Sequence, residues 1–333
     1  MLYSRRDLGK IAAATLPTIR ALGAFHSDIN SKINGVRIGA ITYSFRSLPN
    51  LDDVIKALVQ VGIGEAELMA DQAEVFAGAP RQQRGPGSGE PGGPPPGGGR
   101  RQMTPEQREA FQAAMRVRGE EMRKWRLSAS VDKYKEVRKK FDDAGIDLAL
   151  LCFNMNERTI DDEIEYAFQM AKTLGVRAIT TSTQVTVSKR IAPFAEKHKM
   201  MVGFHGHDNT SNPNELSTPE SLAAAISHSK YHGVNLDIGH FTAANQNAVA
   251  YIEANHGRIT SLHVKDRKKD HGPNVPFGEG DTPIKEVLQL MAKEKYAFPA
   301  NIEFEYRVPE GSDVVTEVGK CLKYCKEALA VSP

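Results

Sequence analysis

The chain has 333 residues, with 43 Lys and Arg against 41 Asp and Glu. This balance argues against a protein that coats nucleic acid, which would need an excess of basic residues. No apolar run approaches the ~20 residues of a membrane span. Because 40% of the residues are hydrophobic, the chain can bury a sizeable core and is not disordered as a whole.

The amino terminus has the pattern of an export signal. Arg5 and Arg6 lie in the basic residues 4–10, and a short, mildly apolar stretch over residues 11–17 follows. A paired arginine before a weak hydrophobic region resembles a twin-arginine signal; the alternative is an ordinary basic amphipathic helix. We expect residues 1–30 to be a twin-arginine signal peptide, with export to the periplasm and no stable membrane insertion after its removal.

A second segment differs in composition from the rest of the chain. Between Gly78 and Gly99 lie nine Gly and six Pro in 22 residues. Such a segment buries too little apolar surface to offset the entropy of ordering it. We predict a disordered insertion at residues 78–101 in a surface loop; a lid over the active site is the alternative.

The remaining chain alternates short apolar runs with amphipathic segments that end at glycine, which indicates a parallel sheet covered by helices. The predicted strands are Val36–Thr42, Ala66–Met69, Ile146–Phe153, Val176–Thr181, Met200–Phe204, Val234–Leu236, Ile259–Leu262 and Ala300–Phe304. The predicted helices are Leu51–Val61, Pro105–Leu127, Asp132–Ala144, Ile160–Leu174, Ser188–His198, Thr218–Ser229, Asn245–Ala254, Thr282–Glu294 and Asp313–Ala328.

Eight strand–helix units over about 275 residues match the size of a (β/α)₈ TIM barrel. A doubly wound open sheet would also alternate, but it would need a Gly-rich phosphate turn after an early strand. Residues 42–50 contain no glycine. We therefore predict an α/β protein with one TIM barrel domain at residues 34–330, interrupted by the insertion.

Four polar residues each terminate an apolar strand run. They are His205, Asp237, His263 and Glu303, separated by 32, 26 and 40 residues, or about one strand–helix unit each. In a barrel they would converge at the carboxyl ends of the strands, where barrel active sites lie. Two imidazoles and two carboxylates suit one divalent metal such as Mn²⁺, Zn²⁺, Co²⁺ or Mg²⁺.

These strand ends lie in motifs that resemble the sugar phosphate isomerase/epimerase superfamily, the xylose-isomerase-like TIM barrels. The motifs are GFHGHDN at 203–209, LDIGH at 236–240, LHVKDR at 262–267, FGEGDTP at 277–283 and IEFEY at 302–306. The resemblance covers about residues 36–330, with the insertion outside it. It implies a xylose-isomerase-like fold, one divalent metal on the four strand-end residues, and a substrate-facing side chain at His240.

The sequence departs from the superfamily pattern at one position. Ketose 3-epimerases have a glutamate as the strand-five ligand, where it pairs with the strand-eight glutamate as two opposed bases. This chain has His205 there. A neutral imidazole bound to a metal has no lone pair left for a substrate proton, so a reaction with one base becomes more plausible than two-carboxylate epimerisation.

Other polar residues near these motifs are candidates for catalysis and substrate binding. Glu67, His207, His240 and Lys265 are the candidate bases, and Lys265 could instead stabilise an oxyanion. The competing interpretations are a solvated rim residue for Glu67, support of a ligand for His207, and a salt bridge for Lys265. The candidate substrate-binding residues are His240, Asn154, Glu305 and Arg267, although Asn154 could be a turn residue and Glu305 could orient a metal ligand.

The chemistry implied is removal of a proton next to a carbonyl, through a metal-stabilised enediolate. The first hypothesis is a metal-dependent isomerase or epimerase of a non-phosphorylated sugar, since sugar phosphates are mainly cytosolic. The alternatives are a lyase that β-eliminates the aglycone of 3-keto-glycosides and a non-catalytic sugar-binding barrel. The expected partner is a small carbohydrate with no nucleic acid, and a homo-oligomer is possible.

Overall fold

The computed structural model describes residues 29–81 and 104–330. The signal peptide predicted for residues 1–30 and the insertion predicted at 78–101 lie almost entirely outside these described residues. The exceptions are residues 29–30 and 78–81, and in the second group the Ala79 N–H donates to the Glu74 carbonyl just after a helix. Within the described ranges, no helix has the length and apolarity to cross a membrane.

Eight parallel strands close into a barrel, as the sequence predicts. In the sheet each strand pairs with its neighbours in chain order, and β2 pairs with both β3 and β11, which closes the ring. The barrel strands are β2 Val36–Ile41, β3 Glu65–Met69, β4 Asp147–Cys152, β5 Ala178–Ser182, β6 Met201–His205, β7 His232–Asp237, β8 Ile259–Val264 and β11 Ala300–Ile302. Three short strands lie outside the ring: β1 Lys32–Ile33, β9 Asp266–Arg267 and β10 Asn274–Val275.

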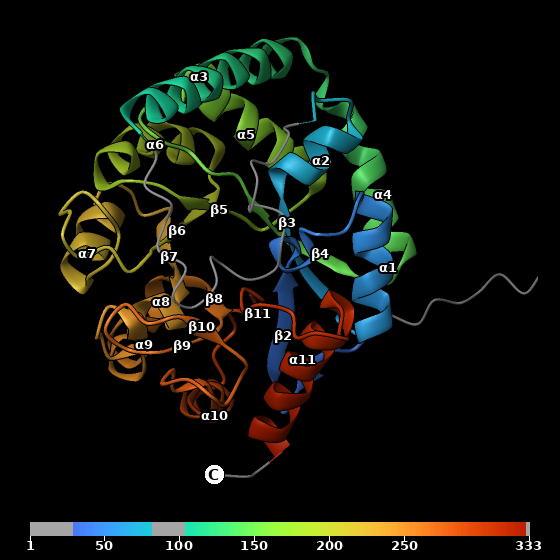
Figure 1. The fold of residues 1–333 in the computed structure, drawn as a ribbon, viewed down its shortest axis with the longest axis vertical. Coiled ribbons are helices and arrows are strands. Elements are labelled where there is room, and N and C mark those ends of the chain that lie inside the picture. The colour runs from blue at the N-terminus through green and yellow to red at the C-terminus, as the bar shows by residue number, and fades with distance from the viewer. Residues whose placement is uncertain (1–28, 82–103, 331–333) are drawn as a thin grey trace, which may run out of the picture.

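Helices surround the strands on the outside (Figure 1). They are α1 Leu51–Val61, α2 Ala70–Phe76, α3 Pro105–Ser128, α4 Tyr134–Asp143, α5 Asp161–Leu174, α6 Val185–His198, α7 Pro219–Ile226, α8 Ile238–Ala243, α9 Ala248–Asn255, α10 Ile284–Glu294 and α11 Val314–Ala330. Every predicted strand and helix overlaps an observed one. The sequence prediction missed α2 and α8, because each begins directly at the end of a strand without a turn residue to mark its start.

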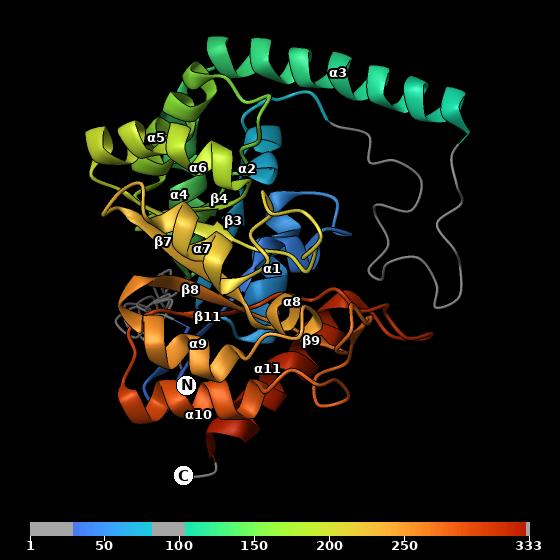
Figure 2. The ribbon, with the colours of Figure 1, turned by 90° about the vertical axis from the view of Figure 1, so that its left-hand side faces the viewer.

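Buried ion pairs attach the long polar helix α3 to the barrel. Arg126 contacts Glu74 at 2.7 Å and Glu163 at 3.0 Å, and both carboxylates are almost fully buried. Figure 2 shows α3 crossing the top of the view beside α5, which carries Glu163. A charge buried in this way is tolerated only when it is paired and hydrogen-bonded, so Arg126 fixes the position of the helix.

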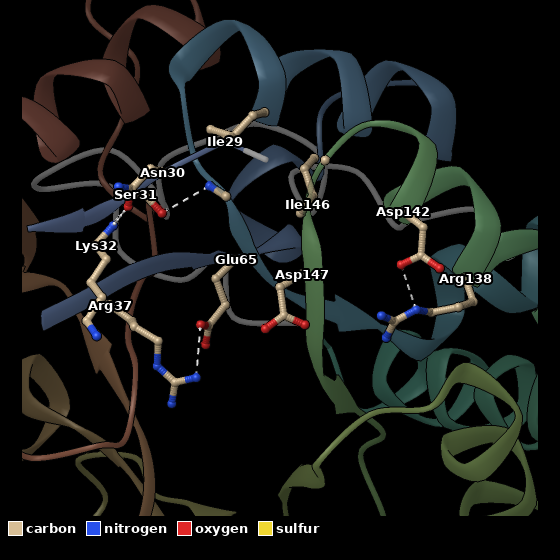
Figure 3. Close-up of a pocket in the computed structure, with 12 residues that line it drawn as sticks. Ile29, Asn30, Ser31, Lys32, Arg37, Glu65, Arg138, Asp142, Ile146 and Asp147 are labelled. Atoms are coloured by element: carbon tan, nitrogen blue, oxygen red, sulfur yellow. Dashed lines mark hydrogen bonds and ion pairs between the residues drawn. The ribbon is translucent and has the colours of Figure 1, made fainter. Parts of the chain in front are cut away.

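The amino-terminal side of the barrel carries a pocket opposite the strand-end residues. The residues that line it include Glu65 and Asp147, the first residues of β3 and β4. Figure 3 shows Arg37 pointing toward Glu65, at 3.5 Å, and Arg138 paired with Asp142 at 2.8 Å. In TIM barrels this face supports stability rather than catalysis, and these paired charges suit that role.

A buried histidine on β7 predicts acid sensitivity. His232 has no exposed surface, its Nδ1 lies 3.1 Å from the Ala225 carbonyl, and burial lowers its pKa to about 4. The unfolded chain takes up this proton near pH 6.5. The stabilisation is therefore complete above pH 6.5 and is lost as the pH falls toward 4, by up to about 3 kcal/mol.

We expect His232→Gln to reduce this loss. Urea unfolding at pH 7.5 and pH 4.5 should show about 2 kcal/mol less acid destabilisation in this variant than in the wild type. His228→Gln is the matched control, because His228 is exposed. Equal acid destabilisation in the wild type and His232→Gln would contradict the prediction.

Candidate active site

The four predicted metal ligands come together at the carboxyl ends of the barrel strands. His205 and Asp237 end β6 and β7, His263 is the next-to-last residue of β8, and Glu303 directly follows β11. All four are buried, and one ligand atom from each lies within 4.8 Å of the others. The structure thus assembles the set that the sequence separates by up to 98 residues.

The donor atoms fit a divalent ion. His205 Nδ1 is buried without a hydrogen-bond partner, which is costly for a polar atom unless a bound group satisfies it. Asp237 Oδ2 is buried too and forms an ion pair with Lys265 Nζ at 3.0 Å. Burial also lowers the pKa of His205 well below its usual value, which keeps the imidazole neutral as coordination requires. A mixed set of imidazoles and carboxylates suits Zn²⁺, Mn²⁺ or Co²⁺.

Asp237 has two functions in this arrangement. Its Oδ1 accepts a hydrogen bond of 2.7 Å from the backbone N–H of His240 and so caps the amino terminus of α8. The cap fixes the carboxylate, which turns Oδ2 toward the other ligands. The spacing of three residues between Asp237 and His240 in the LDIGH motif therefore links the end of a strand, a helix cap and a ligand.

Lys265 is a buried cation beside the ligand cluster. Its Nζ lies 3.0 Å from Asp237, 2.9 Å from Glu303 and 2.5 Å from Glu305, and the side chain is 2% exposed. Burial alone would lower the pKa of Lys265, but the three carboxylates outweigh it and raise the pKa above its ordinary value. Lys265 is therefore an ammonium ion at neutral pH.

His263 lies between two carboxylates. Its Nδ1 is 3.1 Å from Glu303 Oε2 and its Nε2 is 2.9 Å from Glu67 Oε2. Burial would lower the pKa of this imidazole, but the two carboxylates outweigh it and raise the pKa well above the usual value. The ring thus holds protons in the absence of a cation, and a bound metal would displace one of them.

The structure places Glu67 inside the barrel rather than at its rim. Its side chain has no exposed surface, and His263 lies on the side toward the ligand cluster. Thr180 and Asn301 also donate to the carboxylate. A substrate at the mouth of the barrel would meet His263 before it reached Glu67.

A second group of side chains lies next to the ligands. The imidazole of His240 lies between two cations, with Lys265 Nζ 3.0 Å from Nε2 and Arg267 Nη1 2.6 Å from Nδ1. A neutral ring has one lone pair, so it accepts a hydrogen bond from one of the two. Arg267 also pairs with Asp208 at 3.1 Å, and contacts with His240 and Arg267 lower the pKa of Asp208. Each of these residues belongs to one of the three sequence motifs at the ends of β6, β7 and β8.

His205, His207 and His240 form another cluster whose nitrogens lie within 4.8 Å of one another. Its geometry alone could hold an ion, but both nitrogens of His240 already face cationic donors. His207 keeps exposed surface at the mouth, while partial desolvation by the surrounding protein, together with the nearby His240 and Lys265, lowers its pKa to about 4. This cluster therefore presents a neutral imidazole to solvent beside the ligand site.

The other predicted substrate-binding residues lie at the same end of the barrel. Glu305 follows Glu303 by two residues and contacts Lys265. Asn274 Nδ2 lies 3.5 Å from Glu305 Oε2. Asn154 is exposed after β4, and its Oδ1 accepts a hydrogen bond of 2.9 Å from the backbone N–H of Ser182. Asn154 thus joins the ends of β4 and β5.

One loop of the site is fixed by a single carboxylate. Asp266 accepts hydrogen bonds from the backbone N–H groups of Gly278, Gly280 and Thr282 at 2.8, 2.9 and 3.2 Å. A Cβ on Gly280 would lie 1.9 Å from Asp266 Oδ1, so only glycine fits there. The FGEGDTP motif therefore has a structural role: its backbone N–H groups bind Asp266 and so hold β9, the short strand that also contains Arg267.

Sequence reasoning missed three polar residues of the barrel interior: Thr180, Asn235 and Asn301. Asn235 and Asn301 each lie two residues before a proposed ligand and are fully buried. Side chains two apart on a strand share a face. A polar residue two positions before a strand-end ligand is therefore a signal that would have identified Asn235 and Asn301.

Comparison with known proteins places the chain in a family. The family model described as a xylose isomerase-like TIM barrel matches residues 94–325. The chain belongs to this family. The match includes all four proposed metal ligands, Lys265 and the neighbouring histidines, while Glu67 precedes it.

Relatives and solved structures resemble different parts of the chain. L-ribulose-5-phosphate 3-epimerase UlaE of Escherichia coli is 32% identical over 94 residues, which cover 28% of this chain and 32% of that protein. The chain thus matches about a third of the length of this relative. The structure of 3-keto-D-glucoside 4-epimerase YcjR from E. coli has a TM-score of 0.56 at 11% identity and covers 88% of this chain and 99% of that one. An IolI protein with a bound zinc atom has a TM-score of 0.53 at 15% identity, with coverage of 89% and 97%. These two structures share the fold.

Proposed function

We propose that the protein is a metal-dependent isomerase or epimerase that removes a proton next to the carbonyl of a non-phosphorylated sugar. The observation that carries the proposal is the convergence of His205, Asp237, His263 and Glu303 at the barrel mouth, with His205 Nδ1 buried and unpartnered. A divalent ion held by these residues would supply Lewis-acid stabilisation of negative charge on a carbonyl oxygen. The zinc atom in the IolI protein supports this assignment.

The environments of the four candidate bases favour His207. Glu67 is buried behind His263, Lys265 is protonated, and both nitrogens of His240 face cationic donors. His207 is a neutral imidazole exposed at the mouth, so it can accept a proton from a bound substrate. We assign it as the general base.

Lys265 and His240 suit the oxygen atoms of the substrate. The Lys265 ammonium ion faces the space between the ligands and His240. A fixed buried cation stabilises an enediolate oxygen as its charge develops, without reorganisation during the reaction. Arg267 and Asp208 hold the imidazole of His240 in position, and a sugar hydroxyl would bind its Nε2 in place of the present contact with Lys265.

The pairing of charges in the site favours a neutral sugar. Lys265 is paired with three carboxylates, and Arg267 with Asp208. Neither cation can bind a phosphate without leaving a buried or half-buried carboxylate unpaired. The export predicted from residues 1–30 agrees with this, whereas the relative UlaE is named for a phosphorylated substrate.

One observation favours a second candidate, the lyase that eliminates the aglycone of a 3-keto-glycoside. His205 takes the place of the strand-five glutamate, so the site lacks the second carboxylate base of a ketose 3-epimerase. Elimination needs only one base for the α-proton and a proton donor for the leaving oxygen. Elimination can therefore proceed with one base, whereas inversion in a ketose 3-epimerase uses two opposed carboxylates.

Incubation of the purified, metal-loaded protein in D₂O separates these reactions. Ketoses and 3-keto-glycosides would be added separately, and deuterium incorporation and aglycone release would be followed by mass spectrometry. Incorporation without aglycone release supports the isomerase or epimerase, and release supports the lyase. Absence of both reactions over the substrate panel contradicts the catalytic proposal and leaves a binding protein.

A further inference from the structure

Glu67 lies in a cradle of donors inside the barrel. Its Oε1 accepts a hydrogen bond of 2.5 Å from Thr180 Oγ1, and its Oε2 accepts one of 2.9 Å from Asn301 Nδ2. Asn235 Nδ2 lies 3.4 Å from Oε1. These donors come from β5, β11 and β7, while Glu67 itself is on β3. The carboxylate is thus fixed from several sides and has no exposed surface.

The fourth contact of Glu67 is to a proposed metal ligand. Its Oε2 lies 2.9 Å from His263 Nε2, while the other ring nitrogen, Nδ1, lies 3.1 Å from Glu303. Because Glu303 is itself in the ligand set, Nδ1 is the nitrogen on the metal side of the ring. Nε2 is then the nitrogen that carries a proton to an outer partner.

Asn235 offers a competing arrangement of the same ring. Its Nδ2 lies 3.1 Å from His263 Nε2, and an amide N–H there would require an unprotonated Nε2. That nitrogen would then place its lone pair against the Glu67 carboxylate at 2.9 Å. The repulsion favours a protonated Nε2, with the Asn235 amide donating to Glu67 instead.

We propose that Glu67 is a positioning residue for the metal site: it accepts the Nε2–H of His263, fixes that tautomer, and aims Nδ1 at the ion. The inference rests on the metal site of the proposed function. Carboxylate partners of this kind orient metal-bound histidines and raise their basicity. A Glu in the middle of β3 thus acts on the chemistry through a residue 196 positions later.

Measurement of metal affinity by competition with a chelator tests the proposal without any substrate. Glu67→Gln keeps the size of the side chain, but its amide can donate to Nε2 and favours the wrong tautomer. We expect Zn²⁺ or Mn²⁺ to bind about 10- to 100-fold more weakly. Thr180→Val is the matched control, since it removes one donor to Glu67 and leaves the contact with His263. A folded Glu67→Gln protein with wild-type affinity would overturn the proposal.

A second measurement uses the wild-type protein and so does not depend on the folding of a variant. ¹⁵N NMR of the zinc-loaded protein, with imidazole nitrogens labelled, should assign Nε2–H and a metal-bound Nδ1 to His263. The opposite tautomer would overturn the proposal whatever the variants do. A wild-type protein that binds no divalent metal at all would instead contradict the proposed metal site. The two failures are therefore distinguishable.

Discussion

Replacement of Asp237 by asparagine should remove the metal and lower the turnover rate by ~10³-fold or more while leaving the fold intact. Asp237 Oδ2 is a buried atom of the ligand set whose counter-ion is Lys265, and an amide is a much weaker ligand for a divalent ion. A Lewis-acid contribution of several kcal/mol corresponds to this loss, since each ~1.4 kcal/mol is a factor of ten. Metal content by mass spectrometry and turnover would be measured on the same preparation.

The control for this variant follows from the second function of Asp237. Its Oδ1 caps α8 by accepting the His240 N–H, and asparagine caps a helix about as well as aspartate. Asp237→Asn should therefore keep most of the cap, whereas Asp237→Ala should lose about 1 kcal/mol more of unfolding free energy. Full metal occupancy and normal turnover in Asp237→Asn would refute the proposed ligand set.

The barrel was predictable because its signals are local. Each strand is a short apolar run, and helices such as α1 end at Gly62, which adopts the left-handed conformation that glycine allows. The alternation of these units fixes the class of fold. The same pattern places the residues at the strand ends on one face of the barrel, so four side chains far apart in sequence could be assigned to one site.

The contacts between side chains inside the site were not predictable, because they join residues far apart in the sequence and leave no local signal. The contacts of Glu67 involve residues 113 to 234 positions away, and no local pattern records which of several acidic residues at a strand end turns inward. Leu68, Met69 and α2 follow Glu67, so its sequence environment resembled a rim position. The role of Lys265 depended likewise on Asp237 and Glu303, which approach it only after the barrel closes.

The environment of Lys265 predicts the other large effect. Lys265→Met should lower kcat by ~10²- to 10³-fold, the usual effect of losing one group that stabilises a developing oxyanion. It should also lower the free energy of unfolding of the metal-free protein by about 3–5 kcal/mol, because Asp237, Glu303 and Glu305 lose their buried counter-ion. Saturating divalent metal should restore part of this stability, since the ion adds positive charge beside the same carboxylates.

The pH dependence distinguishes a cationic Lys265 from a basic one. In the metal-free protein three carboxylates raise the pKa of Lys265 above its ordinary value of 10.5. Glu305 is outside the ligand set and stays paired with Lys265 when an ion binds, so we expect the side chain to keep its proton up to pH 10. The rate of the wild-type enzyme should therefore not climb between pH 8 and pH 10 on account of Lys265, whereas a lysine base would give a tenfold rise per pH unit until it was deprotonated. Such a rise, present in the wild type and absent in Lys265→Met, would assign the proton transfer to Lys265 and withdraw it from His207. A flat profile with a low rate in Lys265→Met would instead fit a fixed ammonium ion that acts only by its charge, because that charge does not change across the range.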